Sequence, residues 1–311
     1  LWVIVTCTFF MMKNLPGTPF DAERFSIMTP QQQERVLEMY GLNDSLPMQY
    51  VKYIKNMLKG DLGTSFTYVN QDVSKVITGR LGPSALIGIQ AVLIGLAIGL
   101  ILGILAAWKH NSGIDYFTMI LAVLGVSVPN FVAAALLQYY IGLKWGVLPV
   151  GFWTGWNCSV LPSIALSFSA TAMVARFMRT EMLDVLDQDY IVTARAKGLS
   201  QMKVLMRHAV RNSILPVVTI LGPIVVNLMT GSLAVENIFS IPGIGSLFVD
   251  CIKANDYPVI MGITIFYAAF YMLIVLLVDL AYSLIDPRIR LAKGKLSLIH
   301  ISEPTRHAQI S

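Results

Sequence analysis

Charged residues are scarce in this chain of 311 residues. Asp, Glu, Lys and Arg make up 13% of it, whereas hydrophobic residues make up 55%, and the mean hydropathy is +0.65. Soluble domains contain about 25% charged residues, so this chain has too little charge to cover a water-exposed surface of its size. The scarcity excludes an ordinary soluble fold and indicates a protein that faces lipid over much of its surface.

Several chemical signatures are also missing. Cys7, Cys158 and Cys251 are widely spaced and form no CxxC pair, which argues against a disulfide framework and a metal site. The sequence has no G-x-x-x-x-G-K-[ST] phosphate loop and no HExxH motif. We therefore expect no catalytic residue, no bound metal, no cofactor and no ATP hydrolysis in this chain.

Long apolar runs are the main positive feature. Since a helix needs about 20 apolar residues to cross a bilayer, four of the five long runs fit a span and the Val160 run is marginal. The run at residues 1–13 equals about half a span and is interpreted as a truncated first helix. The fold class predicted is an all-α integral membrane protein with six transmembrane helices. The five long runs are Ser84 to Trp108, Tyr116 to Leu143, Val160 to Ala175, Ile214 to Val235 and Pro258 to Ile285.

The basic residues are concentrated in alternate loops. Seven Lys or Arg residues lie between Ala175 and Ile214, and four more lie in residues 286–295 after the last apolar run, whereas loops 144–159 and 236–257 carry one Lys each. Basic loops stay in the cytoplasm, so both termini are expected there. The net charge of +5 is explained by these loops without any binding of nucleic acid.

Residues 14–83 are then extracytoplasmic, and their pattern predicts a small helical cap between the first two spans. Thr29 to Gln32 reads as a capping box with Pro30 at the first helical position, and Gly41 is placed to end that helix. A second amphipathic stretch runs from Leu46 to Lys59 and stops at Gly60.

Two features inside the apolar runs bear on packing and on transport. Gly95, Gly99 and Gly103 recur every four residues, which places them on one helix face and favours the close approach of a neighbouring helix. Asp279 is the only charged residue in the last run and lies near its cytoplasmic end. Because a proton-coupled pump usually carries ionisable residues inside its spans, the energy for transport is expected to come from another subunit.

The cytoplasmic segment 176–213 is much longer than a hairpin needs. Its pattern predicts helical stretches at Thr180 to Leu186 and at Tyr190 to Ala196, a turn at Gly198 and a further helix from Ser200 to Asn212. From the residues alone, such an element can dock into another protein or lie against lipid headgroups.

Several motifs in this segment and beyond it occur together in a known order. They are DYIVTARAKGL at Asp189 to Leu199, Arg207 to Pro216, FSIPGIG at Phe239 to Gly245, Asp286 to Arg288, Leu15 to Gly17 and GDLGTS at Gly60 to Ser65. The set resembles binding-protein-dependent permeases of the ATP-binding-cassette class, most closely the oligopeptide and dipeptide branch. The resemblance extends from Leu1 to about Leu291.

The resemblance implies the type I importer permease fold, with residues 84–291 as a core of five spans and residues 176–213 as a coupling loop. In that family the loop forms a helix that rests in a groove of the ATPase subunit. The wider class usually carries Glu where this chain has Val192, a departure that fits the peptide branch. The residues expected at the contact are Ala194, Arg195, Lys197, Gly198, Leu199 and Lys203.

The resemblance also implies the function and the partners. The chain is expected to form part of the translocation path for oligopeptides or dipeptides in the cytoplasmic membrane of a bacterium. Its expected partners are a second, different permease subunit, two ATPase subunits that bind ATP and Mg²⁺, an extracytoplasmic solute-binding protein and membrane lipid. The alternatives are a nickel, glutathione or other small-solute permease, an ATP-independent secondary transporter or channel, and a polytopic membrane enzyme.

The last residues do not fit this pattern. Residues 296–311, LSLIHISEPTRHAQIS, show no periodicity and do not continue the preceding sequence. They are interpreted as a non-native tail and carry no part of the argument.

Overall fold

The computed structural model describes residues 1–14, 25, 27–39, 41–68, 71–229 and 233–285. Within these residues the chain is helical, apart from turns and one isolated β-bridge between Thr64 and Asp72. The predicted all-α class is confirmed. The motifs at Leu15 to Gly17 and Asp286 to Arg288, and the tail at 296–311, lie outside the described residues.

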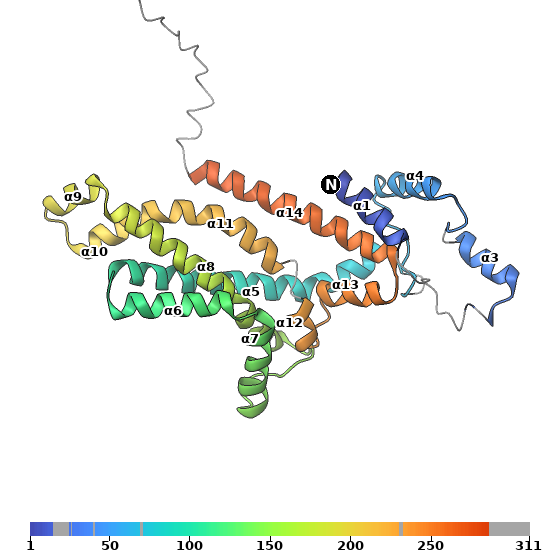
Figure 1. The fold of residues 1–311 in the computed structure, drawn as a ribbon, viewed down its shortest axis with the longest axis horizontal. Helices are drawn as coiled ribbons and strands as arrows, with labels where there is room; N and C mark the ends of the chain where they lie inside the picture. The colour runs from blue at the N-terminus through green and yellow to red at the C-terminus, as the bar shows by residue number, and fades with distance from the viewer. Residues whose placement is uncertain (15–24, 26, 40, 69–70, 230–232, 286–311) are drawn as a thin grey trace, which may run out of the picture.

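The helices form an elongated bundle (Figure 1). Helices α9 (Asp189–Ala196) and α10 (Gln201–Val204) lie at one end, whereas α3 (Pro30–Met39) and α4 (Leu46–Met57) lie at the other. The long helices α5 (Val73–Trp108), α8 (Val160–Leu186), α11 (Arg211–Met229) and α14 (Tyr257–Ile285) run between these two ends.

Membrane-spanning candidates are fewer than expected in the described residues. Four stretches are long and apolar enough to cross a membrane: Val73–Trp108, Trp156–Leu186, Gln201–Ile238 and Tyr257–Leu280. A fifth is the pair Gly113–Ser127 and Asn130–Lys144, if the two helices count as one bent span. Helix α1 (Trp2–Lys13) is apolar but shorter, so the number six remains a prediction.

Helix α5 begins at Val73 rather than at Ser84, where the apolar run begins. Val73, Val76 and Ile77 are buried in a hydrophobic cluster with residues of α13 (Ile244–Lys253) and α14, whereas Lys75 is exposed. A search for uncharged apolar runs excludes this stretch, because it contains Lys75 and Arg80. The helix does not stop there, because one of its faces is buried.

The apolar run from Tyr116 to Leu143 is not one straight helix. It forms α6 (Gly113–Ser127) and α7 (Asn130–Leu137), which meet at an angle of 100° and continue as a π-helical segment, Gln138–Lys144. The break lies at Pro129, which has no N–H to donate and disfavours helical geometry in the residue before it. Val128 accordingly adopts an extended conformation, with φ −83° and ψ 118°.

Helix α8 runs past the predicted end at Ala175 to Leu186. Met178 and Met182 are fully buried in the main hydrophobic core, so this face continues to pack after the first arginine of the segment. The residues at Thr180 to Leu186 are therefore the end of a long helix rather than a separate element.

The glycine-bearing face of α5 lies directly against α8. A Cβ added to Gly95 would lie 2.7 Å from the Cβ of Ala170, and one added to Gly99 would lie 2.7 Å from the Cβ of Val174. At Gly103 the obstacle is the backbone, since the Cβ would lie 2.7 Å from the carbonyl oxygen of Ala175. No larger residue fits at these positions without moving the two helices apart.

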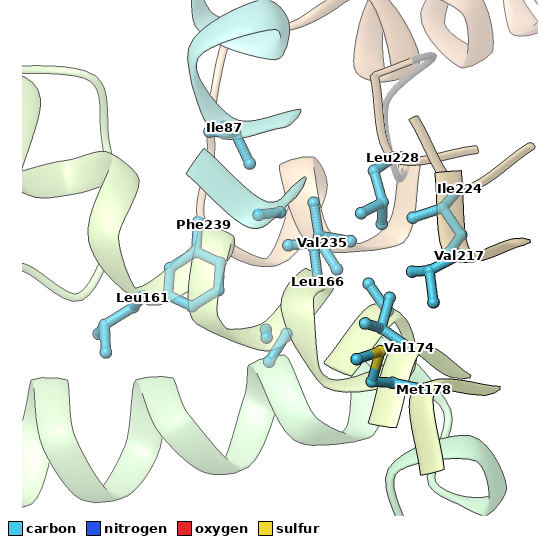
Figure 2. Close-up of a cluster of buried hydrophobic side chains, with 14 of the residues drawn as sticks. Ile87, Leu161, Leu166, Val174, Met178, Val217, Ile224, Leu228, Val235 and Phe239 are labelled. Carbon is cyan, nitrogen blue, oxygen red and sulfur yellow. The ribbon is translucent and has the colours of Figure 1, made fainter. Parts of the chain in front are cut away.

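Around this contact lies the main hydrophobic core (Figure 2). Val174 and Met178 of α8 lie on the side of Val217 of α11, with Ile224 beyond it, while Ile87 of α5 lies at the upper left of the view. Val235 and Phe239, from α12 (Leu233–Ile238) and the residue after it, extend the cluster toward Leu161 at the other end of α8. Helix α8 therefore lies at the centre of the bundle.

Helices α3 and α4 form where the sequence predicts helices within residues 14–83. At the start of α3 the N–H of Thr29 donates to Oε1 of Gln32 at 2.9 Å, which is one half of a capping box. Gly41 and Gly60 have φ of +64° and +81° after α3 and α4, as expected for helix-ending glycines. Tyr50 of α4 shares a hydrogen bond of 2.7 Å with Thr6 of α1.

We predict that Gly103→Ala destabilises the bundle, because the new methyl group meets a carbonyl oxygen of α8. Overpacking of this kind costs typically about 1–3 kcal/mol. Gly79 lies in the same helix with nothing within 4 Å of its Cβ position, so Gly79→Ala is the matched control and should be neutral or stabilising by about 0.5–1 kcal/mol. Thermal unfolding in detergent measures both, and equal shifts for the two variants would contradict the packing described here.

Candidate functional site

The residues of the expected contact form a helix–turn–helix at one end of the bundle (Figure 1). Helix α9 ends at Ala196, and Gly198 follows with φ +77°. The N–H of Gly198 donates to the carbonyl of Arg195 at 2.9 Å, and that of Leu199 donates to Ala194 at 3.4 Å. This is the geometry in which a glycine ends a helix, because other residues pay a steric cost at positive φ.

A small core of its own holds this element together. Ile191 is fully buried, and Ala194 and Val204 are 6% and 2% exposed. Together they pack with Val185 and Leu186 at the end of α8. Because Val185 and Leu186 of α8 form part of this core, the helix–turn–helix packs directly against the end of the central helix of the bundle.

The surface of the element combines positive charge with apolar side chains. Arg195, Lys197 and Lys203 are exposed, and none of them forms an ion pair within the part of the chain that the structure describes. The apolar side chains exposed beside them are those of Tyr190, Val192, Met202 and Met206. Exposed methionine and aromatic side chains next to cations suit the docking of a partner protein with an acidic, apolar groove.

The structure separates the expected contact residues into two groups. Arg195, Lys197, Gly198 and Lys203 are exposed, whereas Ala194 lies in the small core and Leu199 is half-buried against it. Ala194 and Leu199 thus hold the element in shape, and the others form its surface. Gly95, Gly99 and Gly103 lie between α5 and α8, as described above.

Glu236 begins the predicted loop at 236–257, but the structure buries it within α12, at 2% exposure. Its Oε1 accepts a hydrogen bond from Oγ of Ser84 at 2.7 Å, and its Oε2 accepts one from the N–H of Ser246 at 2.9 Å. Ser84 Oγ in turn accepts the N–H of Ile244 at 2.9 Å. This carboxylate therefore joins α5, α12 and the start of α13.

The Phe239 to Gly245 motif explains why the carboxylate fits there. A Cβ on Gly243 would collide with the carboxylate of Glu236, and one on Gly245 would lie 2.9 Å from its Oε2. The two glycines thus leave the room that the buried acid needs. An acid a few residues before a Pro-Gly-x-Gly stretch is the signal that sequence reasoning missed.

Asp256 is a second buried acid that the sequence analysis did not single out. It is fully buried, and its Oδ2 accepts hydrogen bonds from Oγ of Ser65 at 2.5 Å and from the N–H of Thr67 at 3.0 Å. Asp256 lies just before α14, so the pair ties the end of the GDLGTS motif to the last long helix. Asp279, farther along α14, is exposed.

The described residues offer no group of three or more His, Cys, Asp or Glu side chains placed to hold a metal ion. The three cysteines are unpaired, and Cys251 is buried in α13. Burial raises the pKa of the Cys251 thiol to about 12. This thiol is therefore protonated at neutral pH and is a poor nucleophile.

Comparison with known sequences gives a consistent set of relatives. The family model described as binding-protein-dependent transport system inner membrane component matches residues 99–291. The chain is 45% identical over 291 residues to the dipeptide transport system permease protein DppB of Lactococcus lactis, a match that covers 94% of this chain and 95% of the relative. It is 38% identical over 292 residues to the oligopeptide transport system permease protein OppB of Haemophilus influenzae, over 93% and 95%.

Comparison with solved structures shows a similar fold at low sequence identity. A methionine ABC transporter, MetNI, in an inward-facing conformation matches with a TM-score of 0.58 at 14% identity, over 68% of this chain and 96% of that one. An amino acid ABC transporter crystallised with histidines matches with a TM-score of 0.52 at 19% identity, over 69% and 94%.

We predict that Ile191→Ala loosens the helix–turn–helix selectively. Removing a buried isoleucine side chain costs about 2–5 kcal/mol in a well-packed core, and this core has few other members. Amide hydrogen exchange should accelerate over 189–204, while the amides of α5 stay protected. Val192→Ala is the control, since Val192 is 58% exposed, and equal exchange in both variants would show that the small core does not hold the element.

Proposed function

The chain belongs to the family of binding-protein-dependent transport system inner membrane components, and we propose that it is the permease subunit of an ATP-driven importer of dipeptides or oligopeptides. Relatives named as dipeptide and oligopeptide permeases, identical at 38–45% over most of the chain, support this substrate class. The apolar helices agree with a protein that crosses the membrane several times. Its chemical role is to form a path through the bilayer.

The single observation that carries the proposal is the exposed helix–turn–helix of α9 and α10. It projects from one end of the bundle (Figure 1) and is fixed to α8 by a buried core. It carries Arg195, Lys197 and Lys203, which are exposed and form no ion pair with the described residues. We propose that these cations and Gly198 contact an ATPase subunit, with Ala194 and Leu199 supporting them from within. Movement imposed there by the partner then passes directly into the centre of the bundle.

The proposed arrangement in the membrane follows from the basic residues. Helices α9 and α10 lie in the cytoplasm with both termini, while α3 and α4 form an extracytoplasmic cap within residues 14–83. Helix α1 belongs to the first of six spans, and residues 84–291 form the core that holds the other five. The protein is placed in the cytoplasmic membrane of a bacterium.

The proposed assembly contains further subunits. A second, different permease completes the translocation path, two ATPase subunits bind and hydrolyse ATP with Mg²⁺, and an extracytoplasmic solute-binding protein delivers the peptide. Alternating access requires that these partners bind two conformations of the permease pair with different affinities. The rigid connection from α9 to α8 is the physical route by which this chain responds.

We predict that Gly198→Asp abolishes co-purification of the ATPase while the chain still inserts in the membrane. A non-glycine residue at φ +77° costs about 1–2 kcal/mol, and the added negative charge opposes the basic surface. Gly60→Asp is the matched control, because Gly60 also follows a helix, has φ +81° and has nothing within 4 Å of its Cβ position.

The measurement is a pull-down from membranes solubilised in mild detergent, with the ATPase identified by mass spectrometry. The proposed contact requires retention by wild type and Gly60→Asp and loss with Gly198→Asp. Absence of any ATPase from the wild-type sample would refute the importer function itself. Equal retention by all three proteins would refute only the contact at Gly198.

A further inference from the structure

A buried ion pair joins α6 to α8 close to the helix–turn–helix. Nε of Arg179 lies 2.6 Å from Oδ1 of Asp115, and its Nη2 donates to Oδ2 at 2.8 Å. The side chain of Asp115 is 3% exposed and that of Arg179 20%. This is the two-bond fork geometry in which arginine holds a carboxylate most firmly.

The turn between α5 and α6 contributes the remaining partners of this carboxylate. The N–H of Asn111 donates to Oδ2 of Asp115 at 3.0 Å, and Nδ1 of His110 lies 3.1 Å from the same oxygen. Nη2 of Arg179 also lies 3.2 Å from that ring nitrogen. Arg179 therefore contacts the start of α6 and the preceding turn together, while its own backbone belongs to α8.

The rest of the α6–α8 contact is close packing of small residues, with no further hydrogen bond between the two helices among the described residues. The α6 face turned toward the protein carries Asp115, Thr118 and Ala122, which are its buried residues, and Gly125 approaches the backbone of Phe168 farther along. These side chains are small. An apolar groove of about 780 Å³, lined by residues of α5, α6, α7 and α8, opens beside them. The ion pair is thus the strongest directional attachment of α6 to α8 among the described residues.

Arg179 lies on α8 close to the helix–turn–helix of α9 and α10. Seven residues, or about 10 Å of helix, separate it from Leu186, which packs in the small core of α9 and α10. In the opposite direction, α6 leads to the break at Pro129 and into α7. In the π-helical segment that follows α7, Nε2 of Gln138 donates to the carbonyl of Ile238 at 2.7 Å. A continuous chain of contacts therefore runs from α9 through α8 and α6 to the bent pair α6–α7.

Stability alone does not account for a buried pair at this site. Replacing a buried ion pair by apolar side chains of similar volume is often neutral or stabilising, so such a pair is weak evidence for a stabilising role. Its forked geometry does fix the register and orientation of two helices. Here one of the two helices is α8, which continues into the proposed ATPase contact. The other is α6, which forms the first part of the broken span.

We propose that Arg179 is a positioning residue for transport, which locks α6 onto α8 so that movement of α9 and α10 displaces the bent pair α6–α7. This inference rests on the function proposed above. Without this ion pair, the ATPase still binds and still hydrolyses ATP, but its conformational changes displace the bent pair α6–α7 only weakly. Loss of the pair then uncouples ATP hydrolysis from import rather than preventing assembly.

The test compares variants of the full complex, with its ATPases, second permease and binding protein, reconstituted in proteoliposomes. Arg179→Gln and Asp115→Asn should each lower the labelled peptide imported per ATP hydrolysed by about tenfold, within the range by which residues between coupled sites alter coupling. ATPase retention and basal hydrolysis should stay within twofold, roughly, of wild type. Arg179→Lys keeps the charge but not the fork, so it should restore part of the coupling.

Lys109→Gln is the control for lost charge, because Lys109 lies beside the same turn, is exposed, and places its Nζ 5.0 Å from the Trp108 ring. It should import at the wild-type ratio of peptide to ATP.

An unchanged ratio in both Arg179→Gln and Asp115→Asn would overturn the inference while leaving the importer function intact. If these two variants fail to assemble, a wild-type ratio in Arg179→Lys would overturn it as well, whereas an assembled Arg179→Lys with a ratio below wild type would support it. Absence of ATP-driven import by the wild-type complex would instead refute the proposed function.

Discussion

The close approach of α5 to α8 is the constraint on which the rest of the structure depends. In lipid, helices gain little from burying apolar surface against one another, so their association relies on backbone proximity and on polar contacts. Gly95, Gly99 and Gly103 allow that proximity along three turns of α5. With α5 in place, α8 becomes the central helix, and α6, α7 and α11 pack around it. The same helix then leaves the bundle and carries α9 and α10.

Polar anchors fix the ends of this apolar bundle. Glu236 joins α5, α12 and α13, while Asp256 joins the GDLGTS segment to the start of α14. Asp115 and Arg179 do the same for α6 and α8 at the end near α9. Buried polar groups are costly unless they are paired, and each of these carboxylates has several donors. The anchors therefore fix particular helices to one another by directional bonds, which the apolar contacts do not supply.

The sequence predicts a structural feature well where the residues that determine it are close together in the chain. The turn at Gly198 and the two cap helices rest on glycine and capping patterns within a few residues, and the structure has them in the same places. The spacing of the three glycines indicated a helix face, but not that α8 would cover it. The start of α5 at Val73 and the burial of Asp115 depend on partners far away in the chain, as between Arg179 and Asp115, so no local pattern gives them. The 100° break at Pro129 was visible as a proline, but its angle is set by tertiary packing.

The central claim is that ATP hydrolysed by partner subunits, acting through α9 and α10, drives a peptide through this chain. The most direct measurement is accumulation of a labelled dipeptide in proteoliposomes that contain the whole complex and the binding protein. The account predicts accumulation against a gradient when ATP is supplied on the side of α9 and α10. It also predicts no accumulation when a proton gradient is imposed without ATP. Uptake driven by the proton gradient alone would contradict it and would direct attention to Asp279 as the site of ion coupling.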